Sequence, residues 1–352
     1  MRPFKVKRML LSLGLGMGAL ALGAAAQAVD ISGAGATFPY PVYSKWADAY
    51  KKETGIGLNY QSIGSGGGIK QIKAKTVTFG ASDMPLKPED LKEAGLVQFP
   101  MIIGGVVPVV NIKGVKPGSL TLDGATLAAI YLGDIAKWND PRVQKLNPKL
   151  ALPATAIAPV YRSDGSGTNF LFTDYLSKSS SKFKAAIGAN ASVQWPTGIG
   201  AKGNEGVANM TTQTDGAVGY VEYAYAKQNN MAYALLINKA VKAVAPSAES
   251  FQAAASNADW AHADGYYLIL TDQAGAQSWP ITGASFILLY AEPPDVAATS
   301  EALKFFAWAF KSGGPMAAQL DYVPLPATLT AQIRSTWKAH IKSNGASVWK
   351  GE

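Results

Sequence analysis

The chain has 352 residues, of which 48% are hydrophobic and only 16% are charged. This length favours two globular domains over one. The composition excludes collagen, coiled coil and intrinsic disorder. The chain has no cysteine, which excludes a disulfide framework, a zinc ribbon, a cysteine nucleophile and a lipid-modified N-terminal cysteine. The 32 basic residues outnumber the 24 acidic ones, which gives a formal charge of +8.

The N-terminus has the pattern of a secretory signal peptide. Four basic residues among the first eight precede an apolar run from Met9 to Leu22, and Ala26-Gln27-Ala28 follows as a small-residue cleavage site. A membrane anchor is the alternative, but the run is shorter than the roughly 20 residues that span a bilayer. Cleavage after Ala28 leaves 28 basic against 24 acidic residues, a net charge of +4. This excess is mild, so we expect a periplasmic protein that handles an anion and not a nucleic-acid binder, whose basic residues should cluster.

From residue 29 onward, strand-like and helix-like segments alternate. Strands are predicted at Asp30–Ser32, Gly57–Gln61, Phe79–Ala81, Met101–Val110, Ala156–Tyr161, Ala217–Glu222, Ala232–Ile237 and Ser285–Tyr290. Helices are predicted at Pro39–Thr54, Ile69–Lys75, Pro88–Glu93, Leu127–Leu132, Thr168–Leu176, Ser300–Lys311 and Ala327–His340. We expect a turn at Gly33–Gly35 and a loop at Gly64–Gly68. Such alternation predicts an α/β architecture with largely parallel strand pairing.

The strongest local signal is Arg162-Ser163-Asp164-Gly165-Ser166-Gly167-Thr168, which lies between a predicted strand and a predicted helix. Free N–H groups and the positive dipole end make a helix N-terminus an anion site. Ser166 and Thr168 add hydroxyl donors, and Arg162 adds a planar, permanently charged fork. An ordinary strand–turn–helix with a capping hydroxyl explains the serine and the threonine, but it does not explain the arginine.

Two further glycine-rich loops precede predicted helices. They are Gly33-Ala34-Gly35-Ala36-Thr37-Phe38-Pro39 and Gly64-Ser65-Gly66-Gly67-Gly68. Each alone fits a simple glycine turn better than a ligand site, but three hydroxyl-bearing loops at predicted helix starts in one chain are harder to dismiss as turns. Gly198-Ile199-Gly200-Ala201-Lys202-Gly203 matches G-x-G-x-x-G, yet we interpret it as a surface loop. Neither a buried strand before it nor a helix after it is evident.

The sequence offers little for catalysis. It contains only two histidines, and it has no nucleophile-elbow, zinc-protease or clustered zinc-ligand pattern. Asp83 follows a predicted apolar strand, where it is either a functional carboxylate or the cap of the next helix. We therefore expect no catalytic residue, no metal and no cofactor.

Several motifs resemble the PstS family of periplasmic phosphate-binding proteins, which serve bacterial ABC phosphate importers. The similar runs are G-A-G-A-T-F-P at 33–39, Y-Q-S-I-G-S-G-G-G at 60–68, F-G-A-S-D at 79–83, D-G-S-G-T at 164–168, G-Y-V-E-Y-A-Y-A-K-Q-N at 219–229 and W-P-I-T at 279–282. They occur in matching order along nearly the whole chain after residue 28. The resemblance implies a type II periplasmic binding-protein fold, with two α/β lobes, two crossover strands and a ligand in the cleft.

The resemblance also implies a set of ligand contacts. The expected phosphate-binding residues are Thr37, Phe38 through its backbone, Ser65, Asp83, Arg162, Ser166, Gly167 and Thr168. Asp164 matches a carboxylate that orients the arginine. A bare buried dianion would cost many kcal/mol, so dense donors from two lobes suit such a ligand.

The expected domain layout is discontinuous. Residues 29–104 and 285–352 form the first lobe, residues 109–280 form the second, and crossovers lie at 105–108 and 281–284. The expected partners are inorganic phosphate and the membrane permease subunits of an ABC importer, and a monomer is expected. A secreted phosphatase or phosphoryl-transfer enzyme is the main alternative. A sulfate- or molybdate-binding protein is a weaker alternative, which Asp83 opposes.

Overall fold

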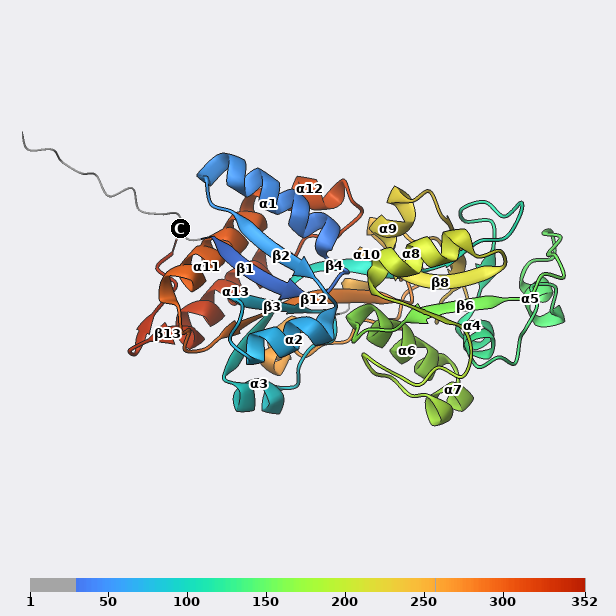
Figure 1. Cartoon of the computed structure of the whole chain (residues 1–352), viewed down its shortest axis with the longest axis horizontal. Helices are drawn as coiled ribbons and strands as arrows, with labels where there is room; N and C mark the ends of the chain where they lie inside the picture. Colours follow the sequence, from blue (N-terminus) through green and yellow to red (C-terminus); the bar gives the residue numbers. More distant parts are fainter. Residues whose placement is uncertain (1–29, 257, 352) are drawn as a thin grey trace, which may run out of the picture.

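A computed structural model describes residues 30–256 and 258–351. The predicted signal peptide and its cleavage site lie outside the described residues. The molecule is elongated, with one group of elements at each end and two long strands running between them (Figure 1). Among the described residues, no helix combines the length and the apolar character needed to cross a membrane.

The strands form one large sheet and two small ones. Their bounds are β1 Ile31–Gly35, β2 Leu58–Ser62, β3 Phe79–Ser82, β4 Leu96–Val110, β5 Thr121–Leu122, β6 Ala158–Arg162, β7 Ile199–Ala201, β8 Ala217–Glu222, β9 Ala232–Tyr233, β10 Leu235–Ile237, β11 Ala243–Val244, β12 Thr282–Tyr290, β13 Lys342–Ser343 and β14 Ala346–Ser347. The large sheet has the order β2-β1-β3-β12-β4-β8-β6-β7, with β9 also paired to β4.

Helices cover the sheet in both parts of the molecule. Their bounds are α1 Tyr40–Thr54, α2 Ser65–Lys73, α3 Pro88–Ala94, α4 Gly124–Tyr131, α5 Pro141–Leu146, α6 Gly167–Ser179, α7 Ser181–Ala186, α8 Gly203–Gln213, α9 Tyr223–Gln228, α10 Ala248–Ala255, α11 Val296–Ser312, α12 Gly314–Ala318 and α13 Ala327–His340, with short 3₁₀ turns at Trp260–His262 and Asp264–Tyr266. The α/β class predicted from the alternation of elements is confirmed.

The prediction of largely parallel pairing is wrong at the centre of the sheet. The outer pairs β1–β2, β1–β3, β6–β7 and β6–β8 are parallel. In contrast, β12 is antiparallel to both β3 and β4, and β4 is antiparallel to β8. The reason is the course of the chain, because β4 carries it from the first part to the second and β12 returns it.

β4 is the strand that joins the two parts. Its first segment pairs with β12 up to Gly105, and its second segment pairs with β8 from Val106 onward. The Val106 N–H donates to the Ile281 carbonyl at 2.9 Å, so the two predicted crossover segments lie side by side. The lobe boundaries drawn around these segments stay a prediction.

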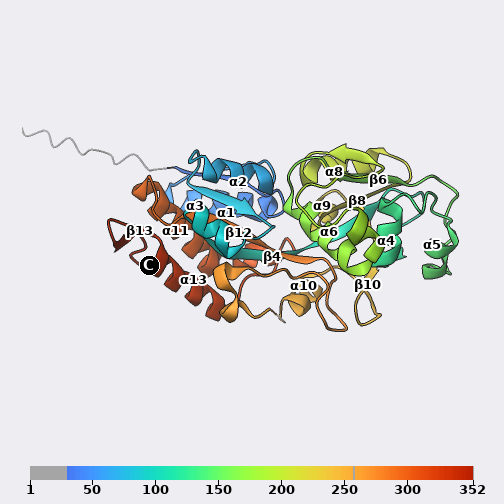
Figure 2. The same ribbon diagram turned by 90° about the horizontal axis from the view of Figure 1, so that it is seen from below.

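Part of the segment between residues 238 and 265, which contains none of the motifs that carried the resemblance, packs under this crossing. Its helix α10 contacts β4 and β12 (Figure 2). Phe251 of α10 lies against Gly105, where any side chain would collide with its ring. The Trp279 indole N–H donates to the Val106 carbonyl at 2.9 Å. This packing supports the backbone at the point where β4 changes partner.

Helix α1 forms as its apolar spacing predicts. Val42, Trp46 and Tyr50 are buried along one face, together with Tyr43, which is the pattern of an amphipathic helix. The helix ends at Gly55, whose φ of 80° is the left-handed conformation that glycine adopts readily at a helix end.

The glycine-rich segments differ from their predicted conformations. Gly33–Gly35 is not a turn but the end of β1, and only Gly64 precedes α2 because residues 65–68 form its first turn. A Cβ on Gly68 would lie 2.5 Å from the Gly35 Cα. These glycines therefore let α2 pack closely on β1.

Candidate functional site

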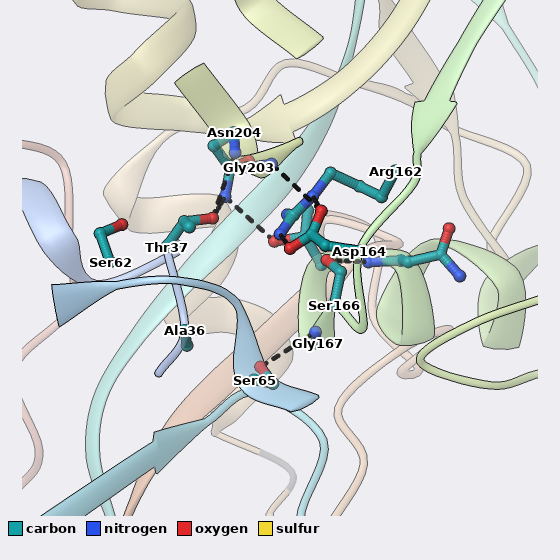
Figure 3. Close-up of polar contacts among 12 residues, drawn as sticks. Ala36, Thr37, Ser62, Ser65, Arg162, Asp164, Ser166, Gly167, Gly203 and Asn204 are labelled. Atoms are coloured by element: carbon teal, nitrogen blue, oxygen red, sulfur yellow. Dashed lines mark hydrogen bonds and ion pairs between the residues drawn. The ribbon is translucent and has the colours of Figure 1, made fainter. Parts of the chain in front are cut away.

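The predicted site residues meet where strands end and helices begin. Figure 3 shows residues from the turn after β1, the start of α2, the end of β6 and the starts of α6 and α8 in one place. In α/β folds, ligands bind outside the carboxyl ends of parallel strands. The structure brings together all nine residues singled out from the sequence, and the buried ones are Thr37, Phe38, Ser65, Asp83, Arg162, Ser166, Gly167 and Thr168.

Asp164 holds the Arg162 guanidinium in a fixed orientation. Arg162 Nε and Nη2 donate to the two Asp164 oxygens at 2.7 and 2.6 Å, and the Gly203 N–H donates to Asp164 Oδ1 at 3.1 Å. Burial alone would raise the pKa of Asp164, but the Arg162 hydrogen bonds and charge hold it below its ordinary value. Arg162 Nη1 is buried and has no protein partner among the described residues. It is therefore available to an anion.

The start of α6 is fixed by its cap and by its contacts with α2 and Asp83. Ser166 is the N-cap and accepts from the Asn169 N–H at 3.0 Å. The Gly167 N–H donates to Ser65 Oγ at 3.0 Å, which joins α6 to α2. A Cβ on Gly167 would lie 2.5 Å from the Asp83 Cβ, so only glycine permits this approach.

The Ser65 hydroxyl is arranged to act as a donor. Its oxygen accepts from the Gly167 N–H and also from the Asp83 N–H at 3.2 Å. A hydroxyl has two acceptor positions and one hydrogen. Because both acceptor positions are used, the Ser65 hydrogen is left to donate.

Asp83 is the exceptional group in this cluster of donors. Its side chain is buried, and neither carboxylate oxygen has a hydrogen-bond partner among the described residues. Burial raises its pKa to about 7, although the hydroxyls of Ser285 and Ser65 and the charge of Arg162 act in the opposite direction. The alternative that Asp83 caps the next helix is wrong, because α3 starts at Pro88 with Lys87 as its N-cap.

This arrangement suits a small anion that carries a hydrogen. One guanidinium, several hydroxyls and helix starts offer donors, while the buried Asp83 carboxylate can accept one hydrogen. Within residues 30–256 and 258–351, no group of three or more His, Asp or Glu side chains has the arrangement of a metal site.

Comparison with known proteins identifies the family. A PBP superfamily domain model matches residues 22–312. The phosphate-binding protein PstS of Pasteurella multocida is 55% identical over 318 residues, covering 90% of this chain and 92% of the relative. PstS of Haemophilus influenzae is 56% identical, covering 87% and 92%. The chain belongs to the PstS family.

Solved structures agree on the fold of this PstS family member. The phosphate-bound periplasmic protein PfluDING aligns with a TM-score of 0.70 at 20% identity, covering 91% of this chain and 98% of its own. A human phosphate-binding apolipoprotein aligns with a TM-score of 0.73, also at 20% identity, covering 92% and 99%. The type II binding-protein fold predicted from the resemblance is confirmed.

Asn204 is a site residue that the sequence analysis missed in this PstS family member. The segment 198–203, interpreted as a surface loop with no helix after it, contains the short strand β7 and leads directly into α8 at Gly203. Residues 198–200 are exposed as expected, but the expectation that no strand or helix forms here was wrong. The helix was missed because Gly203-Asn204-Glu205-Gly206 carries little helix propensity. Asn204 could have been found from its place in a segment where a strand is followed by a glycine, a polar residue and a helix. The three glycine-rich loops recognised in the sequence have the same order.

Tyrosines attach the turn after β1 to distant parts of the chain. The Tyr225 hydroxyl donates to the Thr37 carbonyl at 2.7 Å, and the Tyr322 hydroxyl donates to the Phe38 carbonyl at 2.6 Å. Tyr225 lies in the motif at 219–229, which carried the resemblance to the PstS family but no assigned role. Tyr322 had no sequence signal, because its contact joins residues 284 positions apart.

Proposed function

We propose that this protein binds inorganic phosphate in the cleft between its two lobes and delivers it to the permease of an ABC importer. The observation that carries the proposal is one buried acceptor, Asp83, set among donors that include Arg162 and the start of α6. Near neutral pH, inorganic phosphate is a charged acceptor that also carries a hydrogen. It therefore uses both kinds of group.

The proposed ligand contacts come from both lobes. Thr37, Phe38, Ser65 and Asp83 act from the first lobe, and Arg162, Ser166, Gly167 and Thr168 act from the second. Donors from two sides offset the cost of removing a dianion from water, which neither lobe alone could do. Asp164 does not contact the ligand in this scheme, but holds Arg162 in place.

The proposed location is the periplasm, reached through a signal peptide cleaved after Ala28. PstS relatives are binding proteins, and we propose that this chain likewise acts without catalysis. The Ser65 hydroxyl and Arg162 Nη1 have hydrogens left to donate to an anion, which is what binding without catalysis requires.

The deciding experiment releases the ligand from the protein. The purified protein is denatured and the free phosphate is assayed, and a generic phosphomonoester is offered to the native protein in parallel. We expect phosphate in about equal molar amount to protein, with no turnover of the ester. Catalytic turnover would favour the phosphatase alternative. A protein that releases no phosphate and binds none on titration would refute the proposal.

A further inference from the structure

Asn204, in the first turn of α8, lies between two proposed phosphate ligands. Its side chain is fully buried. Asn204 Nδ2 donates to Thr37 Oγ1 at 2.6 Å and to Thr168 Oγ1 at 3.1 Å, and its backbone N–H donates to Thr37 Oγ1 at 3.2 Å. Figure 3 shows the Asn204 side chain beside Thr37. Because Thr37 follows β1 and Thr168 lies in α6, one amide contacts a hydroxyl from each side of the site.

The orientation of the Asn204 amide is set by a third partner. The Glu222 N–H, at the end of β8, donates to Asn204 Oδ1 at 2.9 Å. A backbone N–H can only donate, so the side-chain atom facing it must be the oxygen. The amide nitrogen therefore faces the threonines, and both of its hydrogens are used by Thr37 and Thr168.

A count of hydrogens then determines what the threonines can do. Thr37 Oγ1 accepts two N–H groups from Asn204, which fills both of its acceptor positions. Thr168 Oγ1 accepts one. Neither hydroxyl can donate back to Asn204, because that residue offers them only donors. Their hydrogens are left for another acceptor.

We propose that Asn204 is a positioning residue that commits the hydroxyls of Thr37 and Thr168 to donate to the bound anion. This inference rests on the proposed function, since it names how that site is organised. A hydroxyl free to rotate would have to be ordered by the ligand, whereas these two are oriented in advance. Asn204 itself need not touch the anion.

The test is a double-mutant cycle on phosphate affinity, measured by calorimetry. Asn204→Leu keeps much of the volume but removes both donors, and we expect it to weaken phosphate binding at least about tenfold. The same substitution is then made in a Thr37→Val/Thr168→Val background. There we expect its effect to fall to less than about threefold, because no hydroxyl is left to orient.

A matched control separates positioning from loss of stability. Asn147 is a buried asparagine whose amide also makes three hydrogen bonds, all with backbone groups of Thr121 and Val143. We expect Asn147→Leu to lower the melting temperature without changing phosphate affinity. If Asn204→Leu fails to fold, Asn204→Asp serves in the same cycle. Its carboxylate still accepts from the Glu222 N–H, but it would draw the threonine hydrogens away from the ligand.

The outcomes distinguish this inference from the proposed function. A wild-type protein that binds no phosphate would overturn both. If wild type binds phosphate and the Asn204 substitution weakens binding equally in both backgrounds, Asn204 does not act through the threonines. An Asn204 variant with wild-type affinity would overturn the inference as well.

Discussion

Replacing Asp83 by asparagine tests how the site would distinguish two tetrahedral anions. Shape cannot separate phosphate from sulfate, but near neutral pH phosphate carries a hydrogen and sulfate does not. The buried Asp83 carboxylate can accept that hydrogen, whereas it would face sulfate as an unpaired, repelling acceptor. A site that demands one hydrogen bond rejects an analogue lacking it by roughly 10⁴–10⁵.

In Asp83→Asn the amide oxygen still accepts from phosphate, while the amide NH₂ can now donate to sulfate. We expect phosphate binding to be kept and sulfate exclusion at pH 8 to weaken by at least about 100-fold. The pKa of Asp83 is raised to about 7, so the wild-type carboxyl gains a proton as the pH falls below that value. Wild-type sulfate exclusion should therefore also weaken between pH 8 and pH 6, and that of the variant should not.

The same shift predicts a change in stability without ligand. When the pKa of a carboxyl is higher in the folded protein than in the unfolded chain, the group stabilises the fold fully at a pH below its unfolded-state pKa. This stabilisation is lost as the pH rises through its folded-state pKa. The rise from 3.8 to about 7 corresponds to about 4 kcal/mol. Phosphate-free wild type should thus lose unfolding free energy from this group between pH 4 and pH 8, and Asp83→Asn should lose none.

The assay titrates phosphate calorimetrically against rising sulfate at constant ionic strength, for wild type and variant at pH 6 and pH 8. Urea unfolding of the phosphate-free proteins between pH 4 and pH 8 measures how the free energy of unfolding changes with pH. An asparagine variant that excludes sulfate as sharply as wild type at pH 8 would refute the reasoning, and the selectivity would then come from the donors.

Three further predictions concern other groups. Arg162→Ala should weaken phosphate binding at least about tenfold, and Arg162→Lys should retain more affinity than the alanine variant. If calorimetry shows unchanged affinity for Arg162→Ala, the arginine does not contact phosphate. The Tyr322 hydroxyl has one hydrogen and lies 2.6 Å from the Phe38 carbonyl and 2.8 Å from Glu222 Oε2, so both contacts are satisfied together only when Glu222 carries a proton and donates it to Tyr322. Burial raises the pKa of Glu222 well above its ordinary value, so its contribution is present at low pH and lost as the pH rises through the folded pKa. Glu222→Gln should keep neutral-pH stability in urea unfolding and remove this pH dependence, and a marked loss at pH 7 would contradict a protonated Glu222. Mass spectrometry of periplasmic protein should give a chain beginning at Val29, and a retained signal peptide would contradict export.

Local chemistry is what the sequence by itself determined. A strand followed by glycine, a hydroxyl and a helix start describes a donor site within a few residues, so the loops at Thr37, Ser65 and Ser166 could be found without a structure. The pairing of Arg162 with Asp164 is also local, since two positions separate them. The family motifs added Asp83, which no local pattern distinguishes from a helix cap.

Only the tertiary structure decided how these groups act on one another. The antiparallel centre of the sheet follows from the return of the chain through β12, which no single segment encodes. Asn204 bonds to a threonine 167 residues away, and the Glu222 N–H determines which way its amide faces. Whether a hydroxyl donates or accepts depends on the neighbours that fill its lone pairs. In this site those neighbours are distant in the chain. Whether the Thr37 and Thr168 hydroxyls donate to a ligand is therefore determined by the fold and not by the local sequence.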